Sequence, residues 1–146
     1  MPEPGGRERR EQVRVRARGT CEYCLSQERF ATQSFSVEHI VPLQAGGGDD
    51  LENLAFACQG CNNHKYTRTD AIDTVSGELV PLFHPRHDRW RDHFIWSHDF
   101  SQIIGLTAKG RATVETLRLN RSGLVNLRLA LMLHGEHPPV EPEDSA

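Results

Sequence analysis

Two Cys-x-x-Cys pairs constrain the fold of this sequence more than any other feature. Cys21 and Cys24 form the first pair, and Cys58 and Cys61 form the second. Two such turns can present four sulfurs to one ion, the tetrahedral coordination that Zn²⁺ prefers in structural sites. No export signal precedes them, so we expect zinc thiolates and not disulfides, with a redox role or chance spacing as the alternative. A closed zinc site explains folding but leaves no open position for catalysis.

The segment between the two pairs predicts two strands joined by a loop. SFSVEHIVPL is extended and ends near His39, AGGGDDLEN is a loop, and LAFAC is a returning strand. A helix is expected directly after Cys61, at about NNHKYTRTDAI. This order places Glu38 and His39 at the end of a strand, Asn53 beside the returning strand and Asn62 at the start of the helix.

These polar residues suit metal-dependent hydrolysis of a phosphodiester. That reaction needs a base to activate water and a divalent cation on the scissile phosphate. His39 suits the first task, and the oxygens of Glu38 and Asn62 are the hard ligands that Mg²⁺ prefers. Because Asn62 directly follows Cys61, the zinc site would fix its position. The sequence therefore predicts a carboxylate, an imidazole and an amide gathered at one point.

The same blocks resemble the HNH endonuclease family. The family pattern reads here as CEYC, EHIVP, GGGDDLENL and CQGCNNHK, in order, over residues 21–66. The resemblance is specific, because about seven constrained positions agree at once. It implies an α+β fold, with a small zinc-stapled, treble-clef-like ββα-metal core. It also implies a phosphodiester hydrolase that leaves 5′-phosphate products on DNA.

The resemblance assigns roles to the polar residues. His39 becomes the general base, Asn53 ties down the loop and helps to orient the base, and Glu38 and Asn62 bind a catalytic Mg²⁺ or Mn²⁺. Asp is common in the family at the Glu38 position, and the extra methylene moves the carboxylate by about 1–1.5 Å. Asn replaces the His of the family name at position 62, and its amide oxygen remains a suitable magnesium ligand.

Two further residues of the second block have open interpretations. His64 lies roughly 200° around a helix from Asn62, so we do not expect both on one ion. It is kept as an alternative metal ligand, with a helix-surface residue as the other interpretation. Lys65 occupies the position of a family lysine, and is interpreted either as a contact to DNA phosphate or as a solvated surface charge.

The composition of the chain predicts one compact domain with arms. Its 146 residues are 37% hydrophobic, which suits a single core. Residues 1–20 are expected to be a basic arm with a short helix, of charge about +3. Residues 21–68 are the core, and residues 69–133 an extension of a hairpin plus helices. Residues 134–146 are expected to be a disordered acidic tail, of charge about −4.

The extension offers several side chains for interpretation. Trp90, Phe94 and Trp96 fit the core better than base stacking. Its last helical pattern should break near Ser122 and Gly123. Four histidines fit no standard metal-ligand spacing: His84, His87, His93 and His98. Five arginines could line a DNA groove or be solvated: Arg86, Arg89, Arg91, Arg111 and Arg121.

The leading hypothesis is thus a DNA endonuclease. A non-catalytic zinc-finger module that binds nucleic acid or protein is the alternative, and an RNA-directed or structure-selective nuclease with the same site is a third interpretation. No run approaches the roughly 18 apolar residues of a membrane helix, and no signal peptide is evident, so a cytoplasmic location and no membrane partner are expected. Neither base specificity nor oligomeric state can be read from the sequence.

Overall fold

The fold was analysed in a computed structural model, which describes residues 6–140. The expectation of an unstructured start at residues 1–5, and that of a disordered tail where it concerns residues 141–146, lie outside the described residues. Among the described residues, no helix combines the length and the apolar character needed to cross a membrane.

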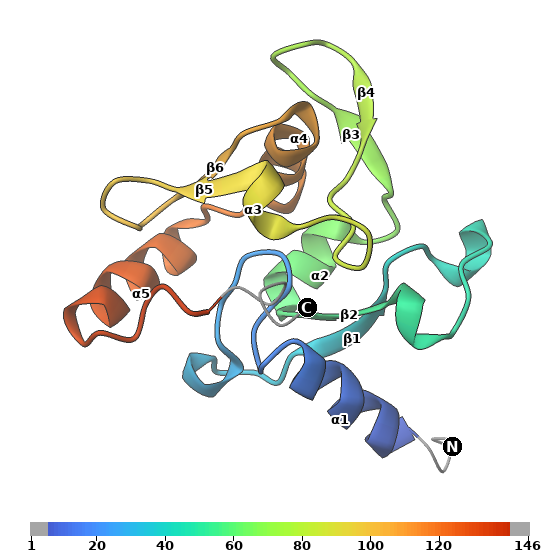
Figure 1. The fold of residues 1–146 in the computed structure, drawn as a ribbon, viewed down its shortest axis with the longest axis horizontal. Coiled ribbons are helices and arrows are strands. Elements are labelled where there is room, and N and C mark those ends of the chain that lie inside the picture. Colours follow the sequence, from blue (N-terminus) through green and yellow to red (C-terminus); the bar gives the residue numbers. More distant parts are fainter. Residues whose placement is uncertain (1–5, 141–146) are drawn as a thin grey trace.

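The centre of the fold is a β-hairpin followed by a helix (Figure 1). Strand β1 (Ser36–His39) pairs antiparallel with β2 (Leu54–Ala57), with His39 opposite Leu54. Helix α2 (Gln59–Lys65) follows and contacts β1. The predicted order of strand, loop, strand and helix is confirmed. The loop contains the short 3-10 helices η2 (Leu43–Ala45) and η3 (Leu51–Asn53).

Helix α2 is shorter than the sequence pattern indicated and begins earlier. It starts at Gln59, because the Cys58 side chain caps it, and it ends at Lys65. Tyr66 adopts a positive φ of 51°, which turns the chain out of the helix. The expected continuation instead forms strand β3 (Asp70–Ile72), which pairs with β4 (Leu79–Pro81). Pairing of these two strands therefore replaces the helical continuation that was expected there.

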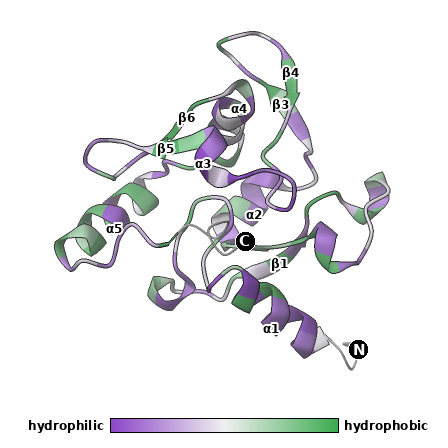
Figure 2. Cartoon of the chain, in the orientation of Figure 1, coloured by the Kyte–Doolittle hydropathy of each residue, from purple (hydrophilic) through white to green (hydrophobic). Residues whose placement is uncertain are grey.

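Helix α1 (Gly6–Arg16) packs beside β2 and is largely hydrophilic (Figure 2). Val13 and Ala17 are fully buried, as their predicted apolar face requires. Arg10 of α1 donates to the Phe35 carbonyl, and other arginines of the helix likewise bind protein groups: Arg9, Arg14 and Arg16.

The extension consists of a second and a third hairpin and three helices. Besides β3 and β4, its elements are α3 (Trp90–His93), β5 (Phe94–Trp96), β6 (Ile103–Gly105), α4 (Ala108–Leu117) and α5 (Ser122–Leu133). The hairpin expected in the extension is present as β5–β6, whose connecting loop contains SHDFS. The predicted helix break lies just before Ser122, where Arg118 adopts a left-handed conformation.

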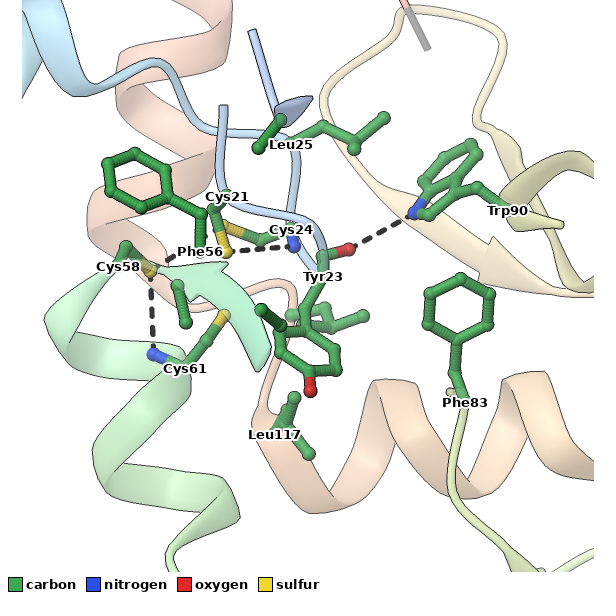
Figure 3. Packing of buried hydrophobic residues seen from close by; sticks show 14 of the residues in the cluster. Cys21, Tyr23, Cys24, Leu25, Phe56, Cys58, Cys61, Phe83, Trp90 and Leu117 are labelled. Atoms are coloured by element: carbon green, nitrogen blue, oxygen red, sulfur yellow. Dashed lines mark hydrogen bonds between the residues drawn. The ribbon is translucent and has the colours of Figure 1, made fainter. Parts of the chain in front are cut away.

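One hydrophobic cluster joins the hairpin, the cysteine turns and the extension (Figure 3). Trp90 and Phe94 are each 2% exposed, and Trp96 packs against the cluster, which confirms their interpretation as core residues. The Trp90 indole donates a hydrogen bond of 3.1 Å to the carbonyl of Tyr23, which lies between the first two cysteines. The extension is thus packed directly onto the turn that carries half of the cysteines.

The expectation of disorder from residue 134 onward is wrong for the described part of the tail. Glu136 binds the Arg29 guanidinium, and its carbonyl accepts a hydrogen bond from Gln27. His137 is buried, and its ring packs edge-on against Trp96 with the centroids 4.6 Å apart. These contacts order a segment that the Pro-rich, acidic composition alone predicts to be disordered.

Candidate active site

The four cysteines form one metal-binding cluster. Their sulfurs all lie within 4.8 Å of one another, and all four residues are buried. A tetrahedral ion with zinc–sulfur bonds of about 2.3 Å requires sulfurs about 3.8 Å apart. Cys24 Sγ and Cys58 Sγ are 3.6 Å apart, so the cluster fits Zn²⁺. Within residues 6–140, it is the one group of three or more His, Cys or acidic residues arranged to hold a metal.

The local backbone shapes each half of this cluster. The amide of Cys24 points to Cys21 Sγ at 3.5 Å, and the amide of Cys61 points to Cys58 Sγ at 3.4 Å (Figure 3). Burial raises the pKa of the Cys21 thiol well above its usual value, whereas hydrogen bonds from Cys21 and its neighbours lower that of Cys24. A bound dication favours the thiolate form of all four cysteines.

Glu38 lies in the interior, next to the cysteine turns. Successive residues of a strand face opposite sides, so β1 buries Glu38 at 5% exposure while the His39 side chain stays 30% exposed. Tyr23 Oη donates a hydrogen bond to Glu38 Oε2, and Lys65 Nζ lies 3.3 Å from Oε1. Burial raises the pKa of Glu38, and the Lys65 charge opposes this shift. Oε1 accepts no hydrogen bond within the usual geometry, and the nearest charged group to it is the Lys65 ammonium.

Lys65 corrects both interpretations made from the sequence. Its side chain is 1% exposed, and Nζ donates a hydrogen bond of 2.8 Å to the Ile40 carbonyl. It is therefore neither a surface charge nor placed to touch DNA phosphate. The physical reason is Glu38, because a buried carboxylate needs a countercharge within a few ångströms.

His39 is held by an acid in the glycine-rich loop. His39 Nε2 lies 2.8 Å from Asp49 Oδ1, and Arg9 of α1 binds the other carboxylate oxygen at 2.8 Å. Hydrogen bonding to His39 lowers the pKa of Asp49, so the acid stays ionised and can only accept. Nε2 then carries the hydrogen, which leaves Nδ1 free to take a proton.

Asn53 closes the loop that begins after His39. Its Oδ1 accepts from the Val41 amide at 2.9 Å, and its Nδ2 donates to the carbonyls of Val41 and Gly48 at 2.9 and 2.7 Å. Gly47 is required here, because a Cβ would lie 1.8 Å from the Val41 carbonyl oxygen. These contacts match the loop-fixing part of the role that the family resemblance gave to Asn53.

We expect Asn53→Ala to lower the free energy of unfolding by about 2–4 kcal/mol, since three hydrogen bonds of a buried amide are lost together. The measurement is urea unfolding of the zinc-loaded protein. Asn63→Ala, the same change at an exposed position of α2, is the control and should alter stability by less than about 0.5 kcal/mol. Equal effects of the two changes would show that the three hydrogen bonds of Asn53 do not stabilise the fold.

The structure separates the two candidate ligands of helix α2. Asn62 is half-buried in the first turn of α2, directly after Cys61, and α2 contacts the strand that carries Glu38. His64 lies near the extension, where burial and the charges of Arg121 and Arg118 lower its pKa. Those positive charges disfavour a divalent cation at His64. Asn62 is the better placed of the two.

Three of the arginines that could have lined a DNA groove are bound within the protein. Arg86 forms an ion pair with the buried Glu22, and Arg111 binds Asp73 through two hydrogen bonds of 3.0 and 2.8 Å. Arg121 lies against the cysteine sulfurs. The charges of these three arginines are balanced by acids or thiolates of the chain itself, so their interpretation as groove-lining cations stays a prediction.

Sequence reasoning missed two residues of the site. Asp49 was read only as part of the loop; a catalytic base is commonly oriented by a third group, but the loop also contains Asp50 and Glu52, and the sequence does not distinguish among them. Tyr23 was read only as a spacer between cysteines. Nothing local in the sequence indicates that its hydroxyl reaches Glu38 across the core.

The comparisons with known proteins agree with this geometry. Residues 21–68 match the family model described as HNH endonuclease. Neither the curated proteins nor the solved structures gave a match. The matched segment contains the hairpin, helix α2 and all four cysteines. Residues 21–68 are thus similar to the HNH endonuclease domain, and the four clustered cysteines fit its zinc-stapled form.

Proposed function

We propose that this protein is a metal-dependent endonuclease that hydrolyses phosphodiester bonds of DNA. The observation that carries the proposal is the pairing on β1 of a buried carboxylate and a half-exposed imidazole. Glu38 keeps one oxygen without a hydrogen bond, and Asp49 engages Nε2 of His39 and leaves Nδ1 free. Burial of the Glu38–Lys65 ion pair carries a desolvation cost, and a task for the carboxylate in catalysis would account for it.

In this proposal each residue has a defined task. His39 Nδ1 removes a proton from the attacking water, and Asp49 holds the ring in the tautomer that permits this. Glu38 and Asn62 hold Mg²⁺ or Mn²⁺, which supplies positive charge to the scissile phosphate and the leaving 3′ oxygen. The products carry 5′ phosphates. Tyr23 and Lys65 keep the Glu38 carboxylate in place, and the zinc cysteines fix the first turn of α2.

The alternative is a zinc-finger module that binds nucleic acid or protein without catalysis. Such a module requires the cysteines and a free basic surface. The α1 arginines that would supply this surface are instead engaged with protein groups, as for Arg9 with Asp49 and Arg10 with Phe35. This gives the alternative less support than the endonuclease.

The proposal is tested by incubating zinc-loaded protein with supercoiled plasmid, single-stranded DNA and RNA, with and without Mg²⁺ or Mn²⁺. We expect plasmid cleavage that depends on the added divalent ion, with zinc content unchanged as measured by atomic emission. Preferential cleavage of RNA would replace the proposed substrate class. Binding without cleavage of any of the three substrates would contradict the endonuclease and favour the binding module.

We expect Glu38→Gln to weaken Mn²⁺ binding by about tenfold or more, because a ligand charge is lost while side-chain size is kept. Calorimetric titration of the zinc-loaded protein measures this. Removal of the Glu38 charge alone leaves the buried Lys65 ammonium without a countercharge, which destabilises the fold. The double variant Glu38→Gln, Lys65→Met is therefore needed to separate an effect on metal affinity from an effect on stability. Glu78→Gln, at an exposed position, is the control. Unchanged Mn²⁺ affinity in the double variant would remove Glu38 from the metal site.

A further inference from the structure

The guanidinium of Arg121 lies against the cysteine cluster. Arg121 Nη2 is 3.6 Å from Cys58 Sγ, and Nη1 is 3.8 Å from Cys61 Sγ. Arg121 precedes helix α5 as its N-terminal cap residue and therefore belongs to the extension, outside the segment that matches the family. We propose that Arg121 is an outer-sphere partner of the zinc site, through which the extension controls how tightly the domain retains zinc.

Charge balance supports this role. Four thiolates and one Zn²⁺ carry a net charge of about −2, and such a buried anion is stabilised by a nearby cation. The described residues place Arg121 at hydrogen-bonding distance from the sulfurs of the second cysteine pair. Donors to zinc-bound thiolates orient these ligands and tune the metal, and their loss typically weakens metal binding by about 10–100-fold.

The guanidinium is held in this position from two sides. Nη1 also donates to the carbonyls of Leu117 and Arg118, at the end of α4, with distances of 2.9 and 3.1 Å. On the other side lies Gly60, between the two cysteines of the second pair. A Cβ at Gly60 would stand 2.7 Å from Arg121 Nη2. The second cysteine turn therefore leaves room for the guanidinium because position 60 has no side chain.

The test is a competition between zinc-loaded protein and a chromogenic zinc chelator. We expect Arg121→Met to weaken zinc binding by about tenfold or more, and Arg121→Lys to weaken it less, because lysine keeps the charge but cannot donate from two nitrogens. Arg118→Met removes an exposed arginine of the same segment and should leave zinc affinity unchanged. In cobalt-substituted protein, Arg121→Met should also shift the sulfur-to-cobalt charge-transfer band, which reports on hydrogen bonds to the thiolates.

Because Arg121→Met also removes bonds to α4, a second variant keeps the test decisive. Gly60→Ala displaces the guanidinium without changing Arg121, and should weaken zinc binding in the same direction. Gly123→Ala is its matched control, since a Cβ at Gly123 meets no atom within 4 Å. The proposal is overturned if Arg121→Met and Gly60→Ala both bind zinc as tightly as wild type, or if Arg118→Met weakens binding equally. None of these measurements depends on nuclease activity.

Discussion

Replacement of His39 by alanine is expected to reduce DNA cleavage by about 10²–10⁴-fold, the usual contribution of a positioned general base. The reason lies in the local geometry. Asp49 accepts from Nε2 at 2.8 Å and leaves Nδ1 to accept a proton from water, and alanine removes that acceptor. The plasmid assay with Mg²⁺ or Mn²⁺ measures the rate, and zinc content is measured on the same sample.

The His39→Ala variant should remain folded, which makes its result interpretable. The His39 side chain is 30% exposed, and its partner Asp49 is exposed as well, so the substitution leaves no buried unpaired group. His98→Ala is a matched control at an exposed histidine of the extension and should cut at the wild-type rate. Equal cutting by wild type and His39→Ala would remove His39 as the base, even if cleavage itself were established.

The sequence predicted those parts of the site that depend on short-range patterns. The spacing of Cys58 and Cys61 predicts a metal turn, and the alternation around Glu38 and His39 predicts a strand end, because both patterns repeat over a few residues. The helix after Cys61 was placed with an error of only a few residues at its start. Its end was missed, since a single residue with a positive φ, Tyr66, ends the helix.

Contacts between distant residues could not be read from the sequence. Lys65 meets Glu38, and Arg121 meets Cys58, only because the fold brings separate elements together. A lysine or arginine in a polar stretch is usually solvated, so its burial depends on whether an anion lies opposite it in space. The same limit applies to His137, whose packing against Trp96 orders part of a tail that composition alone marks as disordered.

Removal of zinc is expected to unfold the core, which is the second large effect. Structural zinc contributes about 10–16 kcal/mol of binding free energy in small domains, comparable to or larger than the roughly 5–15 kcal/mol that stabilises a typical protein. The cysteines also lie in the main hydrophobic cluster. The carbonyl of Tyr23, between Cys21 and Cys24, accepts a hydrogen bond from the Trp90 indole. Loss of the metal should therefore expose Trp90 as well as loosen the turn.

Tryptophan fluorescence and atomic emission measure this effect together. Chelation of zinc, or Cys58→Ser, should shift the emission of Trp90 toward that of a solvated indole, while Ser34→Ala, at an exposed position between the two cysteine pairs, should not. Re-addition of Zn²⁺ should restore the wild-type emission, whereas Mg²⁺ should not, because a thiolate site discriminates against hard cations. A zinc-free protein that kept Trp90 buried and still cut DNA would show that the four cysteines do not hold the active site together. Restoration by Zn²⁺ alone, with cleavage still requiring Mg²⁺ or Mn²⁺, would assign the two metals to two sites, one for folding and one for chemistry.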